Sequence, residues 1–387
     1  MEILFVKQSL EWPRRSGHDV HCYHMMRELN RLGCRIHFLS AVRPSLTAIE
    51  GVDPVAIATF DDLPVAPLQR RMSRMQGKFV SYWGMDPSRI GKVGRYVDEH
   101  EIDAVFVVGL DVLPYLSDVR GAVKVWYAAD EWFLHHWSQV RIFEIASYGE
   151  IRQALVKGVY ERVFASVVDR AIMVSEVDAR WVRRLMPGVE ADVIPNGVDA
   201  EHFVAMPSAI KRSDLVFWGR LDFGPNLDAI RWFSENVWKE LCERVEGVTW
   251  TVYGFGADRR VRDLAKLHGF SLTEDLPDLR GEIAAHRVAI LPMVSGAGIK
   301  NKFLEAAAMG MPIVASKRSL NGVELFGREP CEVAGTAREW IDRVANLLGN
   351  SSRRDTLAVN ARDWAVNHYG WQRVGVAALE GVRSSLS

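Results

Sequence analysis

A lysine and a glutamate, Lys302 and Glu305, are the residues whose types and spacing point most directly to chemistry. They are three residues apart in a segment, Lys300 to Met309, that is predicted to be a helix, so they lie on one face of it. The Ser/Gly-rich turn Ser295 to Gly298 precedes this helix, and Lys300 adds a second positive charge. Backbone N–H groups and the helix dipole favour anions at such a terminus. The segment therefore predicts a phosphate site, with Glu305 suited to the paired hydroxyls of a ribose.

Two short strands are expected to position this loop and helix. The apolar run Val288 to Leu291 predicts a buried strand before the loop, and Ile313 to Ala315 predicts another after Gly310 and Pro312. A strand, a glycine loop and a cationic helix in this order fit a nucleotide diphosphate. The alternative is a solvated helix with an internal Lys/Glu pair, preceded by an ordinary turn.

Strands and helices alternate along most of the chain, which predicts an α/β protein with parallel sheets. A polar segment, Met206 to Ser213, reads as a linker, so we expect Rossmann-like domains at residues 1–205 and 206–370. The second domain opens with a strand that ends near Arg220, placing this cation at the carboxyl edge where such sheets bind ligands. The next strand ends in a glycine turn at Gly254.

Polar residues of the first domain are predicted at the same kind of edge. The first strand is followed by a loop, Ser9 to His18, in which Gly17 either lets backbone approach a ligand or forms a turn. The strand Val123 to Ala128 leads to Asp130, and His135 follows. We expect Asp130 and His135, with Ser16 and His18 of the loop, to shape an acceptor site. A helix N-cap is the competing use for Asp130.

The composition bounds the class of protein. The chain has 387 residues, 48% hydrophobic and 25% charged, which is enough for two domains with real cores. Its formal net charge of −1 gives no general attraction to nucleic acid, so anion recognition must be local. The four cysteines lack the spacing of a zinc site or a disulfide framework, and we expect no metal. No segment approaches the length of a membrane span, which predicts a soluble, cytoplasmic protein.

A basic and apolar stretch, residues 68–96, has a different character. It mixes arginines and lysines with leucine, methionine and aromatic residues. Such a stretch fits peripheral contact with an anionic membrane face, or the wall of an acceptor site. It also fits an ordinary surface helix.

Several separated motifs resemble those of family 4 glycosyltransferases, which are retaining, nucleotide-sugar-dependent enzymes of the GT-B fold. Val193 to Asp199 resembles the motif that joins the two domains, Gly219 to Asp222 the first loop of the C-terminal domain, and Gly298 to Pro312 the donor-binding helix. The segment from Trp364 resembles the one that crosses back, which assigns a helix at about 371–387 to the first domain. The resemblance implies two Rossmann-like domains whose parallel sheets face each other across a cleft.

Residue by residue, the resemblance implies that Arg220 and Lys302 bind the diphosphate and Glu305 the ribose, while Gly298 and Ile299 offer backbone donors. The chain departs from the family where the first of two glutamates is replaced by Ala297, which leaves the donor sugar open. The donor site is further expected to include Gly17, Gly254, Lys300 and Leu304.

The expected activity is transfer of a sugar, with retention, from a nucleotide-diphosphate sugar to a hydroxyl of a sugar, lipid-linked or small-molecule acceptor. No cofactor or metal is expected, because Arg220 and Lys302 can stabilise the charge of the leaving group. The alternatives are a nucleotide-sugar epimerase or a phosphorylase of the same fold, and a catalytically silent nucleotide-sugar-binding protein. A dinucleotide-dependent oxidoreductase fits less well, because no glycine loop completes its fingerprint.

Overall fold

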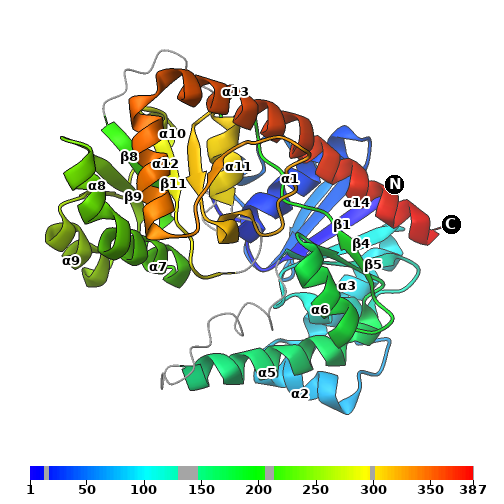
Figure 1. Ribbon diagram of the computed structural model, residues 1–387. Helices are drawn as coiled ribbons and strands as arrows, with labels where there is room; N and C mark the ends of the chain where they lie inside the picture. Colours follow the sequence, from blue (N-terminus) through cyan, green and yellow to red (C-terminus); the bar gives the residue numbers. More distant parts are fainter. Residues whose placement is uncertain (13–16, 130–146, 205–212, 297–300, 387) are drawn as a thin grey trace. The chain divides into compact units, whose positions relative to one another are not determined.

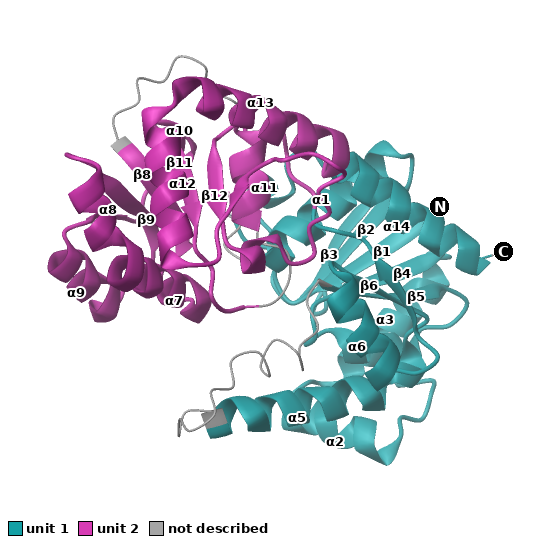
Figure 2. Cartoon of the chain, in the orientation of Figure 1, with its two compact units in different colours: residues 1–196, 371–387 teal, residues 197–370 magenta. Residues whose placement is uncertain are grey.

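The computed structural model describes the chain except for residues 13–16, 130–146, 205–212, 297–300 and 387 (Figure 1). The chain divides into two compact units, which Figure 2 shows in separate colours: unit 1 comprises Met1–Asn196 with Trp371–Ser387, and unit 2 comprises Gly197–Gly370. The boundary predicted at residue 205 lies outside the described residues. Each unit is an α/β layer structure built on a parallel sheet, as the alternation of strands and helices predicts.

Unit 1 contains a parallel sheet in the spatial order β3-β2-β1-β4-β5-β6-β7. Its strands are β1 (Glu2–Lys7), β2 (Arg35–Ser40), β3 (Ala56–Thr59), β4 (Ala104–Val108), β5 (Val123–Ala129), β6 (Arg170–Met173) and β7 (Glu190–Val193). The chain runs outward from β1 to β3 and then returns to place β4 on the other side of β1. The strand order therefore reverses between β1 and β4, which is where open α/β sheets leave a ligand crevice at their carboxyl ends.

Helices cover both faces of this sheet (Figure 1). The helices of unit 1 are α1 (Gly17–Arg31), α2 (Arg74–Tyr82), α3 (Pro87–Glu99), α5 (Ser147–Phe164), α6 (Glu176–Leu185) and α14 (Trp371–Leu386), with short helical turns η1 (Leu46–Ile49), η2 (Leu113–Asp118) and η3 (Ala165–Val167). Helices α1 and α14 pack on one face, whereas α3, α5, α6 and η2 pack on the other.

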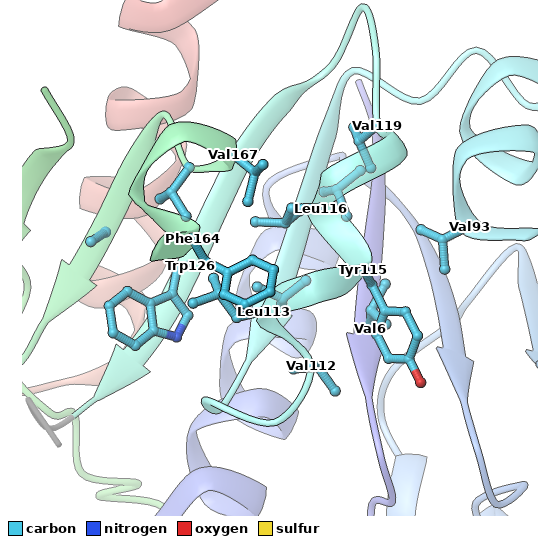
Figure 3. Close-up of a cluster of buried hydrophobic side chains, with 14 of the residues drawn as sticks. Val6, Val93, Val112, Leu113, Tyr115, Leu116, Val119, Trp126, Phe164 and Val167 are labelled. Carbon is cyan, nitrogen blue, oxygen red and sulfur yellow. The ribbon is translucent and has the colours of Figure 1, made fainter. Parts of the chain in front are cut away.

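The central strand β1 shows why the sheet is buried on both sides. Ile3 and Phe5 point into the core beneath α1 and α14, while Leu4 and Val6 point into the opposite core. Successive side chains of a strand face opposite ways, so a strand covered twice must be apolar throughout. Figure 3 shows part of the second core, where Trp126 and Phe164 pack near η2.

The first helix differs from its predicted start. The sequence predicts a loop up to His18, but α1 begins at Gly17 and includes His18 in its first turn. Asp19 then places a carboxylate in the first turn, which the helix dipole favours. His18 is therefore held by a helix instead of a loop.

The C-terminal helix α14 belongs to unit 1. Its first residue, Trp371, stacks on His24 with ring centroids 4.6 Å apart and meets His21 edge-on at 5.5 Å. Gly375 allows α14 to approach α1 closely, because a Cβ at that position would lie 2.7 Å from the Cβ of Glu28. The final turn is tied to the sheet by Arg170, which donates hydrogen bonds to the hydroxyls of Ser384 and Ser385.

Unit 2 contains a parallel sheet in the order β10-β9-β8-β11-β12-β13. Its strands are β8 (Ser213–Arg220), β9 (Trp250–Phe255), β10 (Ser271–Glu274), β11 (His286–Leu291), β12 (Ile313–Ala315) and β13 (Glu332–Val333). Its helices are α7 (Gly224–Phe233), α8 (Lys239–Arg244), α9 (Arg259–His268), α10 (Arg280–Ala284), α11 (Asn301–Ala308), α12 (Ala337–Gly349) and α13 (Ser351–His368), with η4 (Ser234–Trp238) and η5 (Lys317–Leu320). Here the strand order reverses between β8 and β11.

Candidate functional site

The point of reversal in unit 2 brings together the cation and the carboxylate that the sequence analysis placed on one helix. β8 pairs directly with β11, although β9 and β10 separate them in the chain. Helix α11 follows β11 and carries Lys302 and Glu305, and both side chains contact residues of β8. Ligands of open α/β sheets bind outside the carboxyl ends of strands at such a point.

The side chain of Lys302 is held in place by Asn226. Its Nζ donates a hydrogen bond to Oδ1 of Asn226 at 2.9 Å, and Nδ2 of Asn226 donates to the backbone oxygen of Arg220 at 2.6 Å. Asn226 is only 2% exposed, so these contacts are sheltered from water. The same Nζ lies 5.6 Å from the ring centroid of Phe217, within the range of a cation–π interaction. The protein itself therefore fixes the position of this cation.

Glycine at position 219 makes room for that arrangement. Gly219 has a φ of 143°, and a Cβ there would lie 2.5 Å from Cε and 2.7 Å from Nζ of Lys302. A side chain at this position would have to displace the lysine. The approach of the Lys302 side chain to β8 thus depends on a residue without a side chain.

Glu305 is anchored on the same strand. Its Oε2 accepts a hydrogen bond of 2.9 Å from the indole Nε1 of Trp218, which is buried. Burial raises the pKa of the Glu305 carboxyl, while the bond from Trp218 and the charge of Lys302 oppose that shift. The side chain is half-buried, so it combines a fixed orientation with access from solvent. A carboxylate held this way can accept hydrogen bonds from hydroxyl groups.

Arg220 differs from Lys302 because its guanidinium lies at the surface. It pairs with Asp222, with 3.0 Å between Nε and Oδ1, and both side chains are about half exposed, at 46% and 53%. Exposed ion pairs contribute only about 0–1 kcal/mol to stability, so this pair orients the guanidinium but holds it weakly. The Arg220 side chain can therefore exchange its carboxylate partner for an anionic ligand.

Two of the predicted donor-site residues have structural surroundings of their own. A Cβ at Gly254 would lie 2.0 Å from the backbone oxygen of Gly219, so this glycine permits the close pairing of β8 and β9. Leu304 is 1% exposed and belongs to the packed side of α11. Gly298, Ile299 and Lys300 lie outside the described residues, as does Ala297, and their predicted roles stay predictions.

Unit 1 has a cavity of about 330 Å³ at its own point of reversal. Lys7 ends β1, Asp111 follows β4 closely, and both line the cavity together with His18 and Lys157. Lys7 donates from Nζ to Oδ1 of Asp19 and to the backbone oxygen of Ser9, each at 2.6 Å. The cavity thus gathers cationic and carboxylate groups at the carboxyl ends of two neighbouring strands.

Burial shifts the proton affinity of several of these groups. Desolvation lowers the pKa of His18 and of Lys157. Desolvation also raises the pKa of Asp111, even though this residue lies at the exposed rim, because the surrounding protein displaces much of its water. All three shifts disfavour charge, so the cavity favours ligands that supply compensating hydrogen bonds or charge.

The structure places the acceptor residues predicted for unit 1 unequally. His18 lines the cavity, and its Nε2 lies 3.3 Å from the backbone oxygen of Ala128. Gly17 is exposed at the start of α1, and no described atom lies within 4 Å of a Cβ built there, apart from its chain neighbours and its own helix. Ser16, Asp130 and His135 lie outside the described residues.

Sequence reasoning missed Lys7, Asp111, Asn226 and Trp218. Lys7 and Asp111 carried a usable signal, because each stands at or just after the end of an apolar strand, where ligands bind. Asn226 and Trp218 carried none, because their importance comes from contacts with residues more than 70 positions away.

Two general features of the described residues bear on the chemistry. No cluster of three or more histidine, cysteine, aspartate or glutamate side chains within them has a geometry suited to a metal ion. Over the same residues, every helix is too short or too polar to cross a membrane.

Comparison with known proteins assigns the chain to a family. Residues 15–202 match the model described as Glycosyltransferase Family 4, and residues 212–350 match the model described as Glycosyl transferases group 1. A relative from Mycolicibacterium smegmatis, described as GDP-mannose-dependent alpha-(1-6)-phosphatidylinositol monomannoside mannosyltransferase, is 25% identical over 327 residues, which cover 76% of this chain and 80% of that protein.

Solved structures share the fold. Sucrose-phosphate synthase from Thermosynechococcus elongatus superposes with a TM-score of 0.72 at 13% identity, covering 100% of this chain and 99% of that one. The Anabaena protein HepE, solved in complex with UDP, has a TM-score of 0.67 at 14% identity, covering 99% of this chain and 100% of that one. The two family models together match most of the chain, which shows that it is a family 4-like glycosyltransferase. The shared architectures show that it has the two-domain GT-B fold.

Proposed function

We propose that this glycosyltransferase transfers a sugar, with retention, from a nucleotide-diphosphate sugar to an acceptor hydroxyl. The observation that carries the proposal is the anchoring of Lys302 by Asn226 and of Glu305 by Trp218 at one sheet edge. A fixed cation suits a diphosphate, and a fixed carboxylate three residues away suits the hydroxyls of a ribose. The UDP bound by HepE and the GDP-mannose in the name of the mycobacterial relative support a nucleotide donor and leave its base open.

The proposed reaction breaks the bond between the anomeric carbon and the β-phosphate oxygen. That bonding electron pair leaves with the nucleoside diphosphate, and the acceptor oxygen forms the new bond on the same face of the sugar. The acceptor proton passes to the departing phosphate oxygen. Lys302 and Arg220 stabilise the negative charge that develops on the leaving group. The position of Lys302 is set in advance by Asn226, so this cation needs little reorganisation. We propose that these cations make a metal ion unnecessary.

The acceptor side of the proposal lies in unit 1. His18 lines the cavity there, and Asp130, His135 and Ser16 stay proposed acceptor residues. The conservative change Asp130→Asn tests the proposal, because asparagine caps a helix as well as aspartate does. Transfer to acceptor should then fall much more than nucleotide-sugar affinity. Unchanged transfer kinetics would remove Asp130 from the site and leave it the role of a cap.

A panel of nucleotide sugars tests the function as a whole. Slow release of nucleoside diphosphate without acceptor, and faster release with one, is expected for a transferase. Release that depends on inorganic phosphate indicates a phosphorylase, and isomerisation of the sugar on an intact nucleotide indicates an epimerase. Tight binding without turnover indicates a silent binding protein.

Peripheral contact with the inner face of a membrane through residues 68–96 is a further part of this proposal. Between residues 64 and 85 the chain has four cations, Arg70, Arg71, Arg74 and Lys78, and no aspartate or glutamate. Each such cation near an anionic bilayer contributes about 1 kcal/mol. Co-sedimentation with anionic but not with neutral vesicles, at low salt, is the expected result.

A further inference from the structure

An apolar groove lies between α2 and α5 on unit 1. Its volume is about 440 Å³, within the range of ~300–1,000 Å³ that is typical of ligand pockets. Met75, Phe79 and Tyr82 of α2 and Leu155, Val156 and Val159 of α5 line it. The two helices pack side by side, as Figure 1 also shows. Four of these side chains are 44–62% exposed, so the groove presents an unusual amount of apolar surface to water.

The groove adjoins the polar cavity of the same unit through Tyr160. The Tyr160 hydroxyl donates to the backbone oxygen of Leu110 at 3.0 Å, and both residues line the cavity. The Tyr160 ring meets Phe79 of the groove edge-on, with centroids 5.2 Å apart. Trp83, which also lines the cavity, contacts the ring of Tyr82 at 5.5 Å. A single layer of aromatic rings therefore separates a polar site from an apolar one.

Charged side chains lie in both parts of this composite site. Lys7, Lys157 and Asp111 line the cavity, where Lys7 is paired with Asp19, and Lys78 and Arg152 line the groove between its apolar residues. Cations beside an apolar channel are suited to a ligand that has an anionic head and an apolar chain. A purely polar acceptor would not fill the apolar groove, and a purely apolar ligand would leave the polar cavity unpaired. A ligand with both a polar head and an apolar chain accounts for both parts.

We propose that the acceptor of this enzyme is amphipathic: its polar head occupies the cavity of unit 1, and its apolar chain occupies the groove between α2 and α5. This inference rests on the proposed transferase activity and narrows its acceptor to molecules with a hydrocarbon chain.

The test uses butyl phosphate and octyl phosphate as monomeric probes, with the full-length protein and calorimetry as the measurement. Both probes carry the same phosphate head, so the difference between their affinities reports the contribution of the alkyl chain alone. One buried methylene strengthens binding about fourfold. Octyl phosphate should therefore bind at least tenfold more tightly than butyl phosphate. Equal affinities, or no binding of octyl phosphate at millimolar concentration, would overturn the inference.

Substitutions at Leu155 test whether the hydrocarbon chain of the ligand binds in the groove. Leu155→Glu and Leu155→Lys should each remove the advantage of octyl phosphate and leave butyl phosphate binding unchanged; the pair separates loss of apolar contact from repulsion of the anionic head. Leu155 is 55% exposed, so both proteins should fold, which circular dichroism checks. The control is Leu46→Glu, an 86% exposed leucine of the same unit outside the groove, which should bind like the wild type. A Leu155 variant that keeps the octyl advantage would refute the groove assignment.

Other occupants of the groove give other results. If it docks on a bilayer, Leu155→Glu will weaken vesicle binding while monomeric octyl phosphate shows no chain-length effect. If it holds a second copy of the chain, the same substitution will change the sedimentation coefficient. Either result overturns the proposal. Nucleotide-sugar hydrolysis by the wild-type protein and by the control Leu46→Glu is measured in parallel, so a failure of the proposed function is detected separately.

Discussion

The two units carry their polar residues at equivalent places but organise them in different ways. In unit 2, Lys302 and Glu305 are each fixed by a hydrogen bond to a neutral side chain, Asn226 or Trp218. In the cavity of unit 1, desolvation shifts the pKa of His18, Asp111 and Lys157 toward their neutral forms. The equivalent edges of the two sheets therefore differ in how their polar groups are held, by hydrogen bonds to neutral side chains in unit 2 and within a desolvated cavity in unit 1. Such a pair suits a donor that leaves as a polyanion and an acceptor that enters with a neutral hydroxyl.

Lys302→Ala should produce the largest effect on the donor side. Removing a preorganised group that stabilises developing negative charge costs about 2–4 kcal/mol of transition-state stabilisation, taken from the loss of an oxyanion-hole donor. Turnover of the nucleotide sugar should collapse while the melting temperature changes little. The kcat/KM of a correctly folded variant is the measurement. Wild-type activity in the Lys302→Ala protein would contradict the comparison of the two units, because unit 2 would then have no catalytic cation at this position.

Gly254→Ala should disturb the edge of unit 2 through its backbone. The new Cβ would lie 2.0 Å from the oxygen of Gly219, and a backbone atom cannot rotate away. Overpacking of this kind costs about 1–3 kcal/mol, which urea unfolding will measure, and it should also displace the end of β8 beside Lys302. Gly281→Ala is the matched control, since no atom of the described residues lies within 4 Å of a Cβ built at that position, apart from its chain neighbours and its own helix. Equal unfolding midpoints for the two variants would contradict the expected clash.

Acid should destabilise unit 1 before unit 2. His21 is buried against Tyr127 and Trp371, neither of its ring nitrogens has a hydrogen-bond partner among the described residues, and burial lowers its pKa from 6.5 to about 3. Below pH 6.5, His21 therefore binds a proton in the unfolded chain but stays neutral in the native state until the pH approaches about 3. The contribution to stability is complete above pH 6.5 and is lost progressively down to about pH 3, by about 2 kcal/mol between pH 6.5 and 5.

The variant His21→Phe keeps an aromatic ring and cannot titrate, so its unfolding free energy should fall less over that range. In unit 2, the paired Asp278, with a pKa lowered to about 2 by Arg280, loses stabilisation only below its ordinary pKa of 3.8. Parallel pH dependence of the wild type and His21→Phe would show that His21 is not the sensor.

Glu305→Gln should have the smallest effect of the four. The glutamine carbonyl can still accept the hydrogen bond from Trp218, so stability should be preserved. A neutral amide binds hydroxyl groups less strongly than a carboxylate, and a tenfold loss of nucleotide affinity, about 1.4 kcal/mol, is expected. Titration with a nucleoside diphosphate and with its 2′-deoxyribose form tests whether Glu305 binds the hydroxyls of the ribose. The variant should lose the preference for ribose, and a retained preference would place the ribose elsewhere.

Local patterns predicted the architecture and part of the site. The alternation of apolar strands with helices predicted both parallel sheets, and the three-residue spacing of Lys302 and Glu305 predicted their common face. The start of α1 was predicted two residues too late, because Gly17 and His18 have no strong helical preference.

The remaining site residues depend on contacts that no local pattern records. Asn226 gains its role because β8 and α7 bring it to Lys302, 76 residues further along the chain. The groove between α2 and α5 likewise joins segments that lie more than 60 residues apart. Single-sequence periodicity identifies an apolar face but does not identify what the face packs against.

Release of nucleoside diphosphate from a panel of UDP- and GDP-sugars tests the proposed transfer most directly. We predict that the wild-type protein releases nucleoside diphosphate from at least one of them over many turnovers, and that an acceptor with an alkyl chain accelerates the release. A protein that binds nucleoside diphosphate tightly yet turns over no sugar donor on the panel would contradict the proposed activity.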